Sequence, residues 1–144
     1  MSNKKIKNAT QNTVDGINFK SRLEAIIYKI LKEKGFDPKY EPFKFTIWEG
    51  YRPTVPFYDR NSNTGLLRCN KKKLISITYT PDFCFEYKNL FVIIEAKGME
   101  NDVFPIKKKL FRKYLESWKR PVVYFEIYSK KQLLQAIEII KCYE

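Results

Sequence analysis

The sequence predicts an α/β fold in which a mixed β-sheet is flanked by helices. Three segments, about 19–34, 105–118 and 130–143, carry apolar residues at helical spacing. Runs rich in β-branched and aromatic residues lie between them, at 40–48, 75–87, 90–97 and 121–128. Alternation of this kind gives a sheet with helices packed against it. The 144 residues, of which 44% are hydrophobic, are enough for one domain with a buried core.

The two strands at 75–87 and 90–97 predict an antiparallel hairpin. If Lys88 and Asn89 are the central residues of its turn, Asp82 lies directly opposite Glu95. Lys97 projects to the same face as Glu95 because side chains alternate along a strand. The register therefore gathers two carboxylates and one ammonium at one end of the hairpin.

Paired carboxylates suggest a metal site. Like charges directly opposite each other destabilise a strand pair and raise each other's pKa. A bound Mg²⁺ would remove both effects, because it prefers hard carboxylate oxygens. The alternative is a surface hairpin in which Glu95 and Lys97 are solvated and Asp82 begins a turn after Pro81.

Two further carboxylates have competing interpretations. Ser21 is a good N-cap for the first helix and Glu24 follows it by three residues, which is the spacing of a capping box. Glu24 also lies at the edge of the apolar stripe, where it could serve as a third metal ligand, although spacing alone favours the capping box. Glu41 is either an outer carboxylate of the site or a solvated residue at a strand edge.

The charge of the chain suggests a polyanionic partner. Lys and Arg total 28 against 16 acidic residues, a formal charge of +12, and nucleic acid is the first candidate for such an excess. A lysine-rich codon bias is the alternative. The segment 49–73, predicted to form loops and turns, is either a nucleic-acid-contacting surface or an insertion that covers the sheet edge. The expected DNA-binding residues are Lys107, Lys108, Lys109, Arg112 and Lys113 of the second helix, and Arg68, Lys71, Lys72 and Lys73 of this segment.

Several classes of protein are excluded. The chain has no histidine and three cysteines without a CxxC spacing, which rules out zinc fingers, Cys–His nucleophiles and Ser-His-Asp triads. The cysteines are expected to be reduced thiols in the cytoplasm. Neither a signal peptide nor a membrane span is expected, and 1–18 is predicted to be a flexible basic arm.

Short motifs resemble a known nuclease superfamily. PD at 81–82 and EAK at 95–97 resemble the signature of the PD-(D/E)xK nucleases. The motifs FKSRLE at 19–24, YEP at 40–42, YTPDF at 79–83 and IEAKG at 94–98 are similar, in order and spacing, to those of phage Holliday-junction resolvases of the endonuclease I type. The resemblance extends over roughly 19–115.

The resemblance implies a restriction-endonuclease-like core as a single domain over 19–144, with an insertion at about 49–73. It implies a Mg²⁺-dependent DNA endonuclease that Mn²⁺ could also support, in the cytoplasm of the phage's host. Asp82, Glu95, the Ala96 carbonyl and Glu24 would bind the metal, and Lys97 would position or activate water. The partner would be DNA, branched in the case of a resolvase, and symmetric resolution of a junction would require a homodimer.

The chain also departs from these resolvases. Its segment 49–73 is longer, and it has no equivalent of the N-terminal element through which they interlock as dimers. The remaining alternatives are a restriction-, transposase- or repair-type nuclease of the same superfamily, a catalytically inactive DNA-binding module of the same fold, and a structural protein that binds RNA or packs virions.

Overall fold

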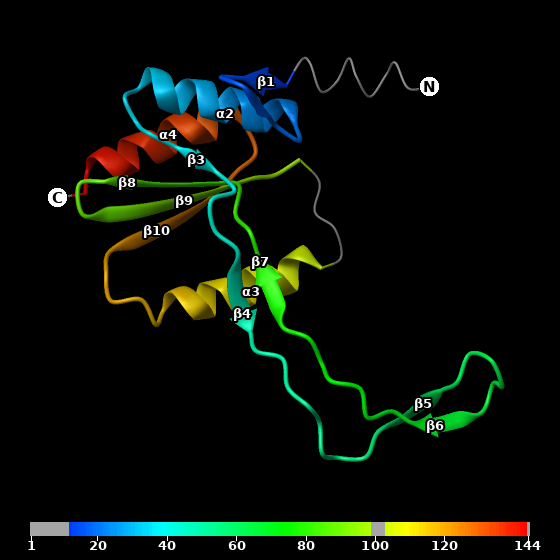
Figure 1. The fold of residues 1–144 in the computed structure, drawn as a ribbon. Coiled ribbons are helices and arrows are strands. Elements are labelled where there is room, and N and C mark those ends of the chain that lie inside the picture. Colours follow the sequence, from blue (N-terminus) through cyan, green and yellow to red (C-terminus); the bar gives the residue numbers. More distant parts are fainter. Residues whose placement is uncertain (1–11, 99–102, 144) are drawn as a thin grey trace, which may run out of the picture.

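The computed structural model describes residues 12–98 and 103–143, and its centre is a four-stranded mixed sheet (Figure 1). In spatial order the strands are β10 (Val122–Ile127), β9 (Leu90–Ala96), β8 (Phe83–Tyr87) and β3 (Lys39–Tyr40). β10 runs parallel to β9, and the other pairs are antiparallel. The prediction of a mixed sheet flanked by helices is confirmed.

Helices cover both faces of the sheet (Figure 1). α2 (Arg22–Glu33) and α4 (Lys130–Lys141) pack on one face, and α3 (Phe104–Leu115) packs on the other. α2 and α4 each begin at a serine N-cap, Ser21 and Ser129 respectively. In each case the serine side chain accepts a hydrogen bond from the backbone N–H three residues later. None of the helices in the described parts of the chain is long and apolar enough to span a membrane.

The register of the β8–β9 hairpin is the predicted one. Tyr87 pairs with Leu90 across the turn at Lys88 and Asn89, and Phe83 pairs with Ile94. Lys88 has a φ of 55°, as a tight two-residue turn requires. Continued by one residue, this register brings Asp82 opposite Glu95.

Two of the predicted strands are broken. The run at 75–87 forms β7 (Ile77–Tyr79) and β8, and the run at 40–48 forms β3 and β4 (Phe45–Trp48). Proline lacks a backbone N–H and so cannot donate to a strand ladder; Pro42 and Pro81 lie in the two breaks. β4 and β7 instead pair with each other and pack against α3. The break leaves Asp82 immediately before β8.

The segment 49–76, here called the hairpin arm, projects away from the body of the molecule (Figure 1). At its far end β5 (Tyr58–Arg60) pairs with β6 (Leu67–Cys69). At its base Tyr51 and Leu74 exchange two backbone hydrogen bonds of 2.9 and 2.8 Å. The alternative in which this insertion covers the sheet edge is therefore wrong.

The chain before α2 is partly folded. Thr13–Val14 (β1) and Ile17–Asn18 (β2) pair across a turn at Asp15 and Gly16, both with positive φ. The flexible arm predicted for 1–18 is therefore wrong for these residues, and its first eleven residues lie outside the described part. An Asp-Gly pair between apolar residues is a hairpin signal that the sequence contained.

Candidate active site

Asp82 is held in a fixed orientation at the start of β8. Its side chain is buried, and its Oδ2 accepts the backbone N–H of Ala96 at 2.7 Å. Its own carbonyl accepts the N–H of Glu41 at 2.8 Å. The Asp82 carboxyl is therefore bound to the end of β9 that also carries Glu95.

Glu95 projects to the α3 face of the sheet, where it meets two tyrosines. The Tyr79 hydroxyl donates to Glu95 Oε1 at 2.5 Å and lies 2.8 Å from the Tyr124 hydroxyl. The Asp82 carboxyl also hydrogen bonds to Glu95. Burial raises the pKa of Tyr79 far above its ordinary value, so this hydroxyl keeps its proton and stays a donor.

The two carboxyl groups share a titration. Burial raises the pKa of both, and the charge of Glu95 adds to the effect on Asp82, whose pKa is raised to about 8. Without a cation, the Asp82 carboxyl therefore retains a proton near neutral pH and donates a hydrogen bond to the Glu95 carboxylate. Such a pair can exchange its proton for a cation.

Lys97 completes the predicted group of three. It is 7% exposed, and its Nζ lies 3.5 Å from the centre of the Phe104 ring at the start of α3. Its positive charge lowers the pKa of Glu95, two residues earlier on the same side of the strand. The face of Phe104 attracts the cation and fixes its position at the start of α3.

Glu24 approaches the same site from α2, on the opposite face of the sheet. Ser21 Oγ accepts the Glu24 N–H at 3.1 Å, as in a capping box, whereas the Glu24 carboxylate accepts from Tyr40 Oη at 2.6 Å and from the Lys20 N–H at 3.2 Å. Its charge raises the pKa of both Asp82 and Glu95. Glu24 therefore lies in the first turn of α2, as the capping box predicts, and its charge also acts on Asp82 and Glu95.

Glu41 lies on the same side. Its carboxylate forms an ion pair with Lys20 Nζ at 2.7 Å, and its charge contributes to the raised pKa of Asp82. Its φ of 48° is a strained value for a non-glycine residue, of the kind that concentrates at functional sites.

The donor set suits a hard cation. Asp82 and Glu95 offer carboxylate oxygens, which Mg²⁺ and Mn²⁺ prefer, and a cation bound to both would offset the effects of burial and of neighbouring negative charge that raise their pKa. In the two described stretches, no three Asp, Glu, Cys or His side chains are gathered closely enough to hold a metal. The structure therefore brings together two candidate ligands, Asp82 and Glu95. The Glu24 carboxylate is engaged by the Tyr40 hydroxyl instead.

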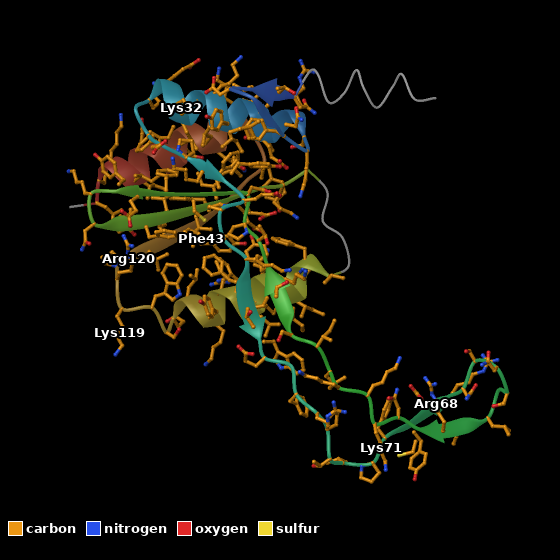
Figure 2. All side chains as sticks on the ribbon, in the orientation of Figure 1. Lys32, Phe43, Arg68, Lys71, Lys119 and Arg120 are labelled. Carbon is orange, nitrogen blue, oxygen red and sulfur yellow. The ribbon has the colours of Figure 1, made fainter. Side chains whose placement is uncertain are left out.

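The predicted DNA-binding residues fall on two separate surfaces. On α3, Lys108 Nζ pairs with Glu126 of β10 at 3.0 Å. On the hairpin arm, Arg68 pairs with Asp59 at 3.1 Å (Figure 2). The other predicted cations of α3 are the half-buried Lys107 and the exposed Lys109, Arg112 and Lys113, and those of the arm are the exposed Lys71, Lys72 and Lys73.

Sequence reasoning missed the residues that support the carboxylates. Tyr79, Tyr124 and Tyr40 orient Glu95 and Glu24, and Phe104 holds Lys97. In the same helix Ile106, although apolar, is 60% exposed, whereas Phe104 is buried. The only local signal was the position of Tyr79 in the YTPDF motif, three residues before Asp82.

Comparison with known proteins gives a family but no activity. No curated protein and no solved structure matches the chain. One family model matches residues 4–131, which is most of the sequence. The chain therefore belongs to the family described as a protein of unknown function, DUF1064.

Proposed function

We propose that this protein is a metal-dependent endonuclease of the PD-(D/E)xK superfamily, with a restriction-endonuclease-like core, that hydrolyses phosphodiester bonds in DNA. The observation that carries the proposal is the carboxyl pair of the buried Asp82 and the half-buried Glu95, on the same strand end as the buried Lys97. Two carboxylates with raised pKa and one amine are the parts that metal-assisted phosphodiester hydrolysis requires. A phage source, a branched substrate and a homodimeric assembly belong to the same proposal.

The cation would be held by Asp82 and Glu95, with the Ala96 carbonyl and Glu24 as further ligands. When bound, Mg²⁺ or Mn²⁺ supplies a more acidic water and neutralises charge on the scissile phosphate. Asp82 would bind the cation as the carboxylate, without its proton. Tyr79 keeps Glu95 in place through its 2.5 Å hydrogen bond.

Lys97 would act on the reacting atoms themselves. Its Nζ can donate to the attacking water or to a non-bridging phosphate oxygen, and its charge offsets the charge that develops at phosphorus. A water oxygen would form the new bond to phosphorus and release a proton to solvent, the bond from phosphorus to the leaving sugar oxygen would break, and that oxygen would take up a proton from solvent. The exposed cations of α3 and the hairpin arm would contact the flanking phosphates.

A cleavage assay tests this proposal. Four-way junction, nicked, linear and single-stranded DNA are incubated with the protein in Mg²⁺, Mn²⁺, Ca²⁺ or EDTA. We expect strand scission in Mg²⁺ and Mn²⁺ only, lost in Asp82→Asn and Glu95→Gln. Glu138→Gln, an exposed carboxylate on α4, is the matched control and should cut like the wild type.

The outcomes separate the alternatives. DNA binding without cleavage in either metal would refute the enzyme and favour the inactive binding module. Cleavage that survives in both site variants would refute the assignment of the site. Equal rates on all DNA forms would leave a nuclease without junction selectivity.

A further inference from the structure

A second site lies at the opposite end of β9 from the carboxylates. A cavity of about 540 Å³, here called the aromatic pocket, is lined by Phe43, Phe45, Phe91, Trp118, Lys119 and Arg120. Phe91 is near the start of β9 and Glu95 near its end, so the two sites are separated by roughly 13 Å of strand. Lys119 and Arg120 lie on the body of the molecule, away from the hairpin arm (Figure 2).

The walls of the aromatic pocket are flat rings from separate parts of the chain. The Phe91 and Trp118 ring centres are 5.3 Å apart, and those of Phe43 and Phe91 are 6.1 Å apart. Phe43, in the connection between β3 and β4, remains 48% exposed although aromatic rings surround it. The rings meet tilted or edge to face rather than stacked, and it is the exposed Phe43 that offers ring surface to a planar ligand.

The rim of the aromatic pocket is cationic. The Arg120 guanidinium carbon lies 5.1 Å from the centre of the Phe91 ring, and Nη1 donates to Glu86 Oε1 at 2.8 Å. Its Nε is buried and has no hydrogen-bond partner among the described residues. The neighbouring Lys119 is exposed. The rim therefore carries two cations, Arg120 held against Phe91 and Glu86, and the exposed Lys119.

These features fit one ligand chemistry. A flat apolar body suits the ring walls, and an attached anion suits Lys119 and Arg120. A nucleotide has both parts, since every base has a ring face and carries a phosphate nearby. In a duplex the base faces are already stacked, so only an unpaired nucleotide can use such walls.

We propose that the aromatic pocket binds an unpaired nucleotide of a nucleic-acid strand, with the base against Phe43 and Trp118 and the phosphate against Lys119 and Arg120. The inference rests on the proposed function only for the choice of nucleic acid as the polymer. It gives a physical reason why substrates with unpaired nucleotides, such as flaps and single-stranded ends, would be preferred over continuous duplex.

Tryptophan fluorescence tests the site without catalysis. The chain has two tryptophans, so Trp48→Phe leaves Trp118 as the only reporter. In EDTA, a single-stranded oligonucleotide should quench this emission and a blunt duplex of equal length should not. Phe43→Ala should weaken single-strand binding about tenfold or more, because stacking on an aromatic side chain contributes at that level. Lys119→Ala should weaken it several-fold.

Matched controls exclude general effects. Tyr143→Ala removes an exposed aromatic and Lys131→Ala an exposed lysine, both remote in the chain from the aromatic pocket, and neither should change the affinity. Circular dichroism melting checks the fold of Phe43→Ala, and Phe43→Tyr, which keeps a ring, should restore binding.

Three outcomes would overturn all or part of the proposal. No quenching by the single strand, or equal weakening in the controls, would overturn the proposal. A free mononucleotide that binds as tightly as the oligonucleotide would overturn the polymeric source. Binding and cleavage are separate readouts, and Trp118 emission in Asp82→Asn should be quenched as in the wild type. A protein that cuts DNA but shows no quenching refutes the aromatic pocket alone. A protein that shows quenching but does not cut refutes the nuclease alone.

Discussion

Replacing Asp82 by Asn should stabilise the metal-free protein while it removes a ligand. The Asp82 carboxyl is buried and its pKa is raised from 3.8 to about 8, chiefly by burial and then by the charge of Glu95. Asparagine keeps an oxygen to accept the Ala96 N–H and an N–H group to donate to Glu95. It carries no charge at any pH.

The sign follows from proton uptake. Between pH 3.8 and about 8 the folded chain holds the Asp82 proton that the unfolded chain releases, so this group makes stability fall as pH rises through that window. Each unit of pKa difference corresponds to about 1.4 kcal/mol, which gives an upper limit near 4 kcal/mol at pH 7. Because the site can relax and admit water, we expect a gain of roughly 2 kcal/mol, or about 4–8 °C in Tm.

Urea and thermal unfolding in EDTA at pH 4, 6 and 8 measure the effect. The difference between Asp82→Asn and wild type should be small at pH 4 and largest at pH 8. Asp59→Asn on the hairpin arm is the matched control, because the pKa of Asp59 is lowered by hydrogen bonds from Asn70 and Arg68. The reasoning is refuted if Asp82→Asn is no more stable than wild type at pH 8, or if its gain does not change with pH.

Three further predictions concern the site and its surroundings. Binding of Mg²⁺ near pH 7 should release about one proton, taken chiefly from Asp82, and calorimetry in buffers of different ionisation enthalpy would detect it; no release would contradict a shared proton. Lys97→Met, which keeps the length of the side chain, should lower the cleavage rate about 100-fold or more while Mg²⁺ affinity changes little, and a wild-type single-turnover rate would rule out its role. Lys109→Glu with Lys113→Glu on α3 should weaken DNA binding and flatten its salt dependence, whereas Lys131→Glu on α4 should do so much less; equal slopes for all variants would show that α3 is only solvated.

The sequence predicted the hairpin that carries the site because two strong local rules agreed. Alternation along β8 and β9 and the short turn at Lys88 and Asn89 fixed the register. The position of Glu24 was harder to predict, because it depends on how α2 crosses the sheet. That crossing is set by tertiary packing, and no periodic pattern in the sequence encodes it.

Other errors have identifiable physical causes. The apolar run at 121–128 is of the kind that favours a central strand, but β10 lies at the end of the described sheet. Both of its faces are apolar because α3 and α4 cover them. Tyr79 was not found because its hydroxyl reaches Glu95 from a strand that does not pair with β9. Tyr79 lies in β7 and Glu95 in β9, and these belong to separate sheets.

The hairpin arm gives the chain a natural point of division. Its two legs return to the body as β4 and β7, which pair with each other, so a cut at the exposed tip near Ser62 would yield two fragments that the body still holds together. One fragment would carry Glu24, and the other would carry Asp82, Glu95 and Lys97. Separately expressed halves should therefore reassemble, and a fluorescent domain should be tolerated at the same tip.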